Sequence, residues 1–264
     1  MAKLYLGTRG GAIAYGGGYY EIPRYESDGR AVYQRQIVLN GTEFAGITTA
    51  YNNSLANLFY NMNSVSGTFS MPDLEEIRAG GLQSVGFSTN IDSISFPNLR
   101  TVRDSGLYQA FYRTRITSIS FPKLELVSRT GFAGAFTGLN FTSADIIFPK
   151  LKKIDMQGFQ ETFALSTAVV IRFPVLDEMS YGSCMSMCRG CTTIEHIYFN
   201  ALKTTSFAFS ECFDYMMRDT GTTTTHTIHF PSNLESTVQT LSGYPLFGGT
   251  NGSVVLAFDL PATS

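Results

Sequence analysis

A short pattern recurs along this chain: an apolar residue, one variable residue, a large apolar residue, proline and, in most copies, leucine two positions later. The copies are FSMPDLEEI (69–77), ISFPNLRTV (94–102), ISFPKLELV (119–127), IIFPKLKKI (146–154), IRFPVLDEM (171–179), IYFNALKTT (197–205) and IHFPSNLES (228–236). The proline position is occupied by Pro72, Pro97, Pro122, Pro149, Pro174, Asn200 and Pro231, at spacings of 25 to 31 residues with a mean of 26.5. A near-constant period of this length predicts a fold of stacked repeats.

The residues around each proline position indicate a half-buried strand. In the second copy, Ile94 and Phe96 lie three and one positions before Pro97, and the other copies also have apolar residues there. Apolar residues two apart, many of them β-branched or aromatic, are typical of a strand with one buried face. Proline lacks the amide hydrogen that a continuing strand needs, so it ends the strand. Leu99 and Val102 supply further apolar positions two and five residues later.

A second apolar segment follows in each repeat. Nine residues after the proline position lies a glycine in four copies, as Gly81, Gly106, Gly131 and Gly158. Apolar residues lie ten and fourteen positions after the proline position, for example Phe132 and Phe136 after Pro122. A separation of four residues fits one face of a short helical turn. Each unit is therefore predicted to contain a strand, a turn, a brief helical or irregular segment and a return. One unit cannot bury its own apolar face, so stacked neighbours must form the core.

The repeat pattern divides the chain into three parts. Around Ala45 the apolar positions match a degenerate first repeat, and SVVLAF (253–258) matches a closing strand. We therefore expect a solenoid of about seven to eight repeats over 41–258. Residues 1–40 do not fit the repeat, and their Gly- and Tyr-rich segments predict a small β-rich arm that docks onto an assembly, or a cap over the first repeat. Residues 259–264 are predicted to be a flexible end.

The strand pattern I-x-F-P-x-L-x-x-I and the element G-F-x-x-A-F, present as GLYQAF (106–111) and GFAGAF (131–136), resemble the BspA-type leucine-rich repeats of bacterial surface and phage proteins. The resemblance covers residues 41–258, with Phe in place of the usual Ile before proline and irregular last repeats. It implies leucine-rich-type repeats in a curved solenoid with a strand-lined concave sheet, and partner recognition as the broad class of function. The N-terminal MAKLYLG is in addition similar to the starts of small phage structural and tail proteins.

The composition excludes several classes of protein. With 19 Lys and Arg against 21 Asp and Glu, the formal net charge is −2, so the chain lacks the basic stripe of a nucleic-acid binder. No window holds about 18 apolar residues, so no membrane insertion is expected. The first residues lack the apolar stretch of a secretory signal. Four cysteines in 264 residues are too few for a disulfide scaffold.

Three cysteines form the candidate metal site. They are Cys184, Cys188 and Cys191, with Cys212 and His196 nearby in sequence. Cys188 and Cys191 have half of a zinc-site spacing. However, Cys184 and Cys188 occupy the repeat positions that Phe132 and Phe136 fill in an earlier copy. We therefore interpret them as small buried hydrophobes and expect no metal and no cofactor.

No catalytic signature is present in the sequence. Three histidines, His196, His226 and His229, occur without a G-x-S-x-G elbow or an HExxH sequence. The glycine run GGAIAYGGG lacks the Lys and the Ser or Thr of a phosphate loop. We therefore expect no enzyme activity. The alternative is a catalytic domain hidden within the irregular stretch 205–250.

The solvent-facing positions of the strands change along the repeats. The row two before proline reads Ser70, Ser95, Ser120, Ile147, Arg172, Tyr198 and His229, and the row four before reads Thr68, Ser93, Ser118, Asp145, Val170, His196 and Thr227. Because neighbouring solenoid strands lie about 4.8 Å apart, Arg172, His196, Tyr198 and His229 are predicted to form one patch. Tyr and Arg are enriched at binding hot spots, so we expect this patch to contact a partner. The alternative is an ordinary hydrated sheet face.

Together these features favour a non-catalytic structural and adhesion protein of a phage particle, in the tail fibre or head decoration class. Its partners would be other virion proteins, or a host surface protein or glycan. Low charge and many aromatic residues also suit packing against symmetric neighbours, so we expect a homo-oligomer located in the virion. The alternative is a bacterial cell-surface or secreted adhesin of the same repeat family, which requires an export route.

Overall fold

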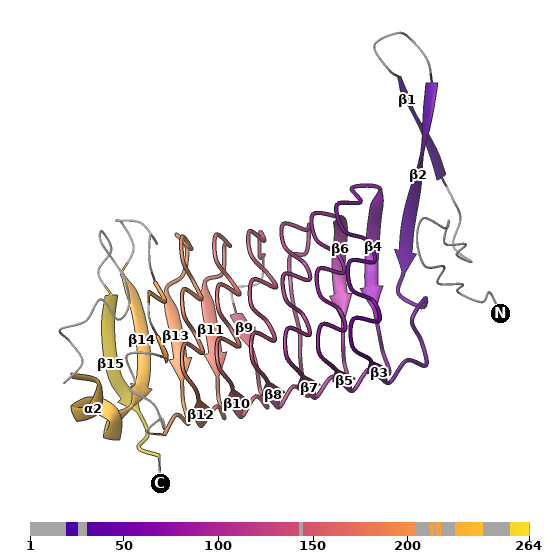
Figure 1. The fold of residues 1–264 in the computed structure, drawn as a ribbon. Coiled ribbons are helices and arrows are strands. Elements are labelled where there is room, and N and C mark those ends of the chain that lie inside the picture. Colours follow the sequence, from indigo (N-terminus) through magenta and orange to yellow (C-terminus); the bar gives the residue numbers. More distant parts are fainter. Residues whose placement is uncertain are drawn as a thin grey trace.

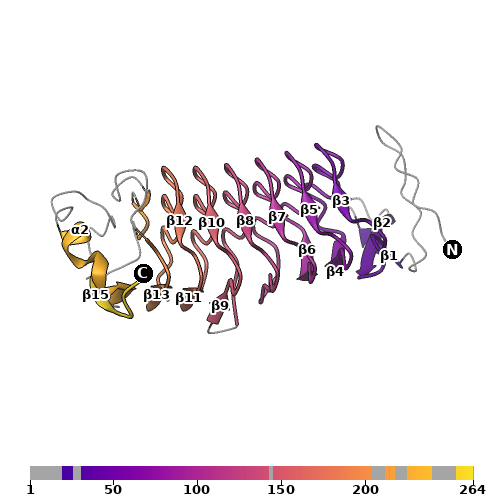
Figure 2. The ribbon, with the colours of Figure 1, turned by 90° about the horizontal axis from the view of Figure 1, so that it is seen from below.

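The structure, a computed structural model, is an elongated parallel β-solenoid of about seven turns with very little helix (Figure 1). It describes residues 20–25, 31–142, 145–203, 212–213, 215–217, 225–239 and 254–263. The chain winds along one axis, and each turn of the solenoid, or coil, lies beside the next (Figure 1, Figure 2). The predicted stacking of repeats is confirmed.

One side of the solenoid carries the longer strands. They form a four-stranded sheet ordered β1-β2-β4-β6 and a five-stranded sheet ordered β15-β14-β13-β11-β9. The strands are β1 (Tyr20–Tyr25), β2 (Ala31–Asn40), β4 (Val65–Ser70), β6 (Asn90–Ser95), β9 (Asp145–Ile147), β11 (Val170–Phe173), β13 (His196–Phe199), β14 (His226–Pro231) and β15 (Val254–Leu260). All neighbours in these sheets pair in parallel except β1 and β2. Strands β4, β6, β9, β11, β13 and β14 end within two residues of the proline position, as the pattern predicts. Residues 119–121, the corresponding segment of the third copy, form no strand, so the prediction fails there and this side is divided into two sheets.

The second side is a six-stranded parallel sheet that the sequence analysis did not predict. Its strands are β3 (Thr49–Ala50), β5 (Glu76–Ile77), β7 (Thr101–Val102), β8 (Leu126–Val127), β10 (Lys153–Ile154) and β12 (Glu178–Met179). They lie four and five residues after the proline position, and the fifth residue is buried in every one. Two residues are too few to show the alternation by which a strand is recognised in a sequence.

The third side consists of overlapping reverse turns. In the first coil the Ser54 amide donates to a carbonyl three residues back at 3.0 Å, whereas the Asn53 amide donates to Ala79 of the next coil at 3.0 Å. Left-handed backbone recurs at every fourth residue, with φ of 54°, 59° and 56° at Asn53, Asn57 and Asn61. The sequence predicted a brief helical or irregular segment at this place in each repeat. The helical alternative is wrong, because the backbone forms successive turns. A turn unit of four residues places every fourth side chain on one face, as a helical turn does, so the apolar spacing fits both.

The phenylalanines predicted to point inward form one continuous interior column. The column consists of Phe96, Phe121, Phe148, Phe173, Phe199, Phe230 and Phe258, with neighbouring ring centroids 5.2–6.1 Å apart. All of these rings except Phe258 are at most 1% exposed. Burial of large aromatic side chains against their neighbours in adjacent coils is the main favourable contribution to stacking.

The first end of the solenoid is covered by β2, whose second half continues the sheet. Its residues 37–40 pair in parallel with 65–68 of β4, and Leu39 is buried. The first half of β2 pairs with β1 in an antiparallel hairpin that projects beyond the coils (Figure 1). Within the predicted N-terminal part, residues 20–25 and 31–40 are strands, and residues 1–19 and 26–30 lie outside the described residues. The degenerate first repeat packs as predicted through the buried Phe44, Ala50, Leu55 and Phe59.

The far end is formed by β15 and a short helical segment. After β14, a 3-10 turn η1 (Ser232–Leu234) leads into α2 (Glu235–Gln239). The predicted boundary after residue 258 falls within β15, and the Thr263 amide donates to Asn233 Oδ1 at 3.1 Å. Most of the stretch 205–250 lies outside the described residues. Among the helices that are described, none has the length and apolar character to cross a bilayer.

Candidate functional site

The register of the five-stranded sheet brings the predicted site residues together. Arg172 in β11 pairs with Tyr198 in β13, which in turn pairs with His229 in β14, so these three form one row across the sheet. His196 lies two residues before Tyr198 on the same strand and therefore on the same face. The four residues predicted as one patch are neighbours in space.

Arg172, Tyr198 and His229 stack on one another from strand to strand. The guanidinium carbon of Arg172 lies 4.2 Å from the centroid of the Tyr198 ring, which is within cation–π range. On the other side of Tyr198 the His229 ring stacks at a centroid separation of 4.1 Å and an interplanar angle of 9°. Both faces of the Tyr198 ring are thus covered, and the row offers ring edges and polar atoms to solvent.

A hydrogen-bonded chain of two imidazoles and a carboxylate continues from the stack. His229 Nδ1 lies 2.9 Å and 3.0 Å from the two carboxylate oxygens of Asp259, and His229 Nε2 lies 3.1 Å from His196 Nδ1. A carboxylate only accepts, so His229 Nδ1 carries the hydrogen, and in the neutral imidazole His229 Nε2 then accepts from the Nδ1–H of His196. This assignment leaves His196 Nε2 as the open end of the chain.

The four predicted residues belong to a larger group, which we call the stacked polar cluster. It consists of Asp145, Arg172, His196, Tyr198, His229 and Asp259. Asp145 Oδ2 lies 3.6 Å from Arg172 Nε and ends the cluster opposite Asp259. Asp259 was missed because the sequence pattern ended the last strand at Phe258. Continuing the alternation of β15 by one residue would have found it, because it lies two residues after Ala257, which pairs with His229.

The stacked polar cluster contains a base and an orienting carboxylate without a nucleophile. Asp259 holds the His229 imidazole as the carboxylate of a catalytic triad does. The third group of the chain is a second imidazole, and within the part of the chain that the structure describes no hydroxyl or thiol is hydrogen-bonded to either ring. The side chains of Arg172 and Asp259 are 36% and 57% exposed, so hydrogen-bonding groups of the cluster are accessible to solvent.

On the four-stranded sheet of the same side, the outward positions carry small hydroxyl side chains, as predicted, although Ser70 is buried rather than solvent-facing. Thr68 of β4 and Ser93 of β6 hydrogen-bond to each other at 2.8 Å, and Ser70 pairs with Ser95 in the same register. Small hydroxyl side chains that bond to each other project little from the sheet. The large outward groups of the cluster therefore stand on the five-stranded sheet, away from this Ser/Thr surface.

The cysteines are core residues. Cys184, Cys188, Cys191 and Cys212 are fully buried, and none of the four forms a disulfide. Burial raises the pKa of the Cys184 and Cys188 thiols well above 9.0 and that of Cys191 to about 11. The interpretation of Cys184 and Cys188 as buried hydrophobes is confirmed. Among the described residues, no three His, Cys, Asp or Glu side chains gather into a metal-binding group.

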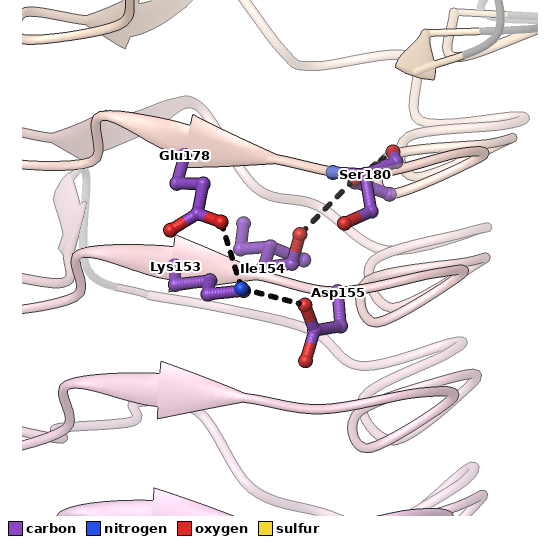
Figure 3. Close-up of polar contacts among 6 residues, drawn as sticks. Lys153, Ile154, Asp155, Glu178 and Ser180 are labelled. Carbon is purple, nitrogen blue, oxygen red and sulfur yellow. Dashed lines mark hydrogen bonds and ion pairs between the residues drawn. The ribbon is translucent and has the colours of Figure 1, made fainter. Parts of the chain in front are cut away.

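The second sheet carries a ladder of paired charges. Figure 3 shows Lys153 of β10 between two carboxylates: its Nζ lies 2.7 Å from Glu178 Oε1 on the next coil and 3.4 Å from Asp155 Oδ1. The hydrogen bond to Glu178 holds the pKa of the Lys153 ammonium above its ordinary value. The Ser180 amide also donates to the Ile154 carbonyl at 3.1 Å, between the same two coils (Figure 3). These charges are engaged in joining coils.

Comparison of the chain with models of protein families, with curated proteins and with solved structures gave no match. The fold, the repeat pattern and the stacked polar cluster are thus the features from which a function is inferred.

Proposed function

We propose that this protein is a non-catalytic structural and adhesion protein that binds a partner through the stacked polar cluster. The observation that carries the proposal is the cluster itself, in which Arg172, Tyr198 and His229 stack in one row on a repeat scaffold. Tyr and Arg are enriched at binding hot spots. Side chains already held by stacking also lose little conformational freedom when a partner binds. Repeat solenoids use such extended surfaces for recognition.

The cluster suits a partner rich in hydrogen-bonding groups. Because both faces of the Tyr198 ring are covered, a flat ligand cannot stack on it, and recognition has to use the edges of the row. Arg172 supplies guanidinium donors, Tyr198 a hydroxyl and Asp259 a carboxylate acceptor. A host surface protein or glycan presents the hydroxyl, amide and carboxylate groups that match these side chains.

The setting that we propose is a phage particle, with the protein as a homo-oligomeric component of the tail fibre or head decoration class. The resemblance of the repeats to BspA-type leucine-rich repeats supports it, as does the similarity of MAKLYLG to the starts of phage structural proteins. The β1–β2 hairpin extends away from the coils, as an arm that docks onto other virion proteins would (Figure 1). The alternative setting is a bacterial cell surface or its exterior, with the protein as a BspA-like adhesin.

The role of the cluster is tested by attachment assays with Arg172→Ala and Tyr198→Ala. Truncation of a hot-spot residue costs about 2 kcal/mol or more, so we expect attachment to weaken at least about tenfold. Ser95→Ala and Ser120→Ala on the Ser/Thr surface are matched controls and should attach like the wild type. Circular dichroism checks that each variant folds. If both cluster variants attach like the wild type, the proposed function is wrong.

The setting is tested by immunogold electron microscopy of native phage particles and of the bacterial host. The phage proposal predicts label on tail fibres or on the capsid surface, with several copies at symmetric positions. Label confined to the bacterial envelope would contradict it and support the adhesin alternative.

A further inference from the structure

We propose that His196 and His229 form a two-imidazole binding site for a divalent transition-metal ion such as Ni²⁺, Cu²⁺ or Zn²⁺. His196 Nδ1 and His229 Nε2 face each other at 3.1 Å across strands β13 and β14. Two imidazole nitrogens that each lie about 2.0–2.1 Å from one metal ion have this separation when the angle at the metal is about 100°. The strands therefore already hold the two nitrogens at a chelating distance.

Asp259 prepares the first ligand. It accepts the Nδ1–H of His229 at 2.9 Å, which leaves His229 Nε2 unprotonated and directed at His196. Metal-ligating histidines almost always donate their other N–H to a carboxylate, a carbonyl or water, which fixes the tautomer and makes the ligand more basic. The His229 side chain is only 9% exposed and stacks on Tyr198, so its ring is held in place.

The second ligand needs a change of tautomer and a turn of its ring. Without metal, the Nδ1–H of His196 donates to His229. With metal bound, Nδ1 releases that proton to solvent, Nε2 takes one up from solvent, and the Nδ1 lone pair coordinates the metal, so the charge of the imidazole pair is unchanged. In the described part of the chain His196 Nε2 has no hydrogen-bond partner that opposes this. The metal takes the position in front of His229 Nε2, so the half-buried His196 ring turns until its Nδ1 lone pair also points at the metal, and water completes the coordination.

The chemistry of the pair selects the metal. Neutral imidazoles suit Zn²⁺, Cu²⁺ and Ni²⁺, whereas Mg²⁺ and Ca²⁺ take oxygen ligands. The other soft ligands of the chain are poorly placed to compete. The third histidine, His226, is 1% exposed and its Nδ1 lies 2.6 Å from the Ile194 carbonyl, and the four cysteines are buried.

The test is a Ni²⁺ titration of the untagged full-length protein by calorimetry, with Mg²⁺ as the contrasting ion. We expect one Ni²⁺ per chain and no Mg²⁺ binding, and a rise of the melting temperature with Ni²⁺ because the metal binds the folded state. His196→Gln and His229→Gln should each weaken Ni²⁺ binding at least about tenfold, and Asp259→Asn about tenfold through the lost support of His229. Asp145→Asn, the matched carboxylate at the other end of the cluster, should bind Ni²⁺ like the wild type.

The metal site does not depend on the proposed adhesion, since binding and melting are measured without any partner. Absence of Ni²⁺ binding to the wild type at millimolar metal would overturn it. Unchanged affinity in the His196→Gln/His229→Gln double variant would do the same. Circular dichroism of each variant separates loss of the site from loss of the fold.

Discussion

Glu76 shows how a single outward side chain joins two coils. Its carboxylate accepts hydrogen bonds from Arg103 Nε at 3.0 Å and from Arg78 Nε at 3.2 Å. The hydrogen bond from Arg103 is the largest cause that lowers the pKa of Glu76 below its ordinary 4.5; partial burial opposes it and Arg78 adds to it. A carboxyl group whose pKa is lower in the folded state stabilises the fold as long as it is ionised.

We expect Glu76→Gln to lower the free energy of unfolding by about 0.5–1 kcal/mol near neutral pH, the range of surface ion pairs. The contribution of Glu76 is present above its unfolded-state pKa of 4.5 and is lost as the pH falls through the lower folded-state pKa. The difference between wild type and variant should therefore shrink in acid. Urea unfolding at neutral and acidic pH measures it, with the exposed Glu75→Gln as a control of small effect. A difference that stays constant in acid would contradict this assignment.

Within one coil, two core positions are linked through the turn that follows each short strand. In four coils a β-branched residue ends that strand and a glycine follows four positions later, as Val127 and Gly131. A Cβ atom on Gly131 would lie 2.8 Å from Val127 Cγ1 and 3.0 Å from the Ser128 carbonyl oxygen. In a later coil the pair is Met179 and Ser183, both buried. Methionine is unbranched at Cβ, so a serine fits there, and its hydroxyl donates to a backbone carbonyl. The glycines therefore serve close packing.

This pairing predicts a coupling between the two positions. Gly131→Ser alone should lower the free energy of unfolding by about 1–3 kcal/mol, because it overpacks the core against a branched side chain. Val127→Met alone, which enlarges a fully buried side chain, should also cost about 1–3 kcal/mol. The double variant reproduces the Met179–Ser183 pair. Its loss in free energy of unfolding should be at least about 1 kcal/mol smaller than the sum of the losses of the two single variants. Urea unfolding of the three variants gives the coupling energy, and simple additivity would show that the pairing is incidental.

In the part of the chain that the structure describes, the coils form a row in which the main contacts join each coil to its neighbours. Strand pairs, turn amides and the phenylalanine column all join one coil to the next. The stability of such a solenoid is approximately a sum of terms within coils and between neighbouring coils. A defect in a middle coil therefore removes contacts on two sides, and a defect in the last coil removes contacts on one side.

Two positions of the same column test this description. Phe148 is fully buried, with its ring 6.1 Å from Phe121 and 5.4 Å from Phe173, so Phe148→Ala should cost about 3–5 kcal/mol. Phe258 is half-buried in the last coil, with its ring 6.0 Å from Phe230, so Phe258→Ala should cost clearly less. Urea unfolding compares the two, and hydrogen exchange should show faster opening of the coils beside residue 148. Equal costs at both positions would rule out a nearest-neighbour solenoid.

Much of the core followed from the sequence. The same inward positions are buried in each coil, so the pattern of Ile and Phe two residues apart, followed by Leu, recurs at a near-constant period. This period predicts stacked repeats without any knowledge of the turns. Stacked repeats also imply parallel strands in register. Arg172, Tyr198 and His229 each lie two residues before the proline position, so the sequence predicts them in one row although they are 26 and 31 residues apart. Binding of a partner by that row stays a prediction.

The sequence by itself thus determined the repeat, the inward column and the order of outward residues, because these depend on local alternation repeated many times. Only the tertiary structure decided the second sheet, the left-handed turns and the contact between His229 and Asp259. Strands of two residues show no alternation, and a spacing of four fits both a helix and a turn. The hydrogen bond between His229 and Asp259 depends on the side-chain torsions of both residues and joins strands that are 30 residues apart in sequence. No local sequence pattern specifies either.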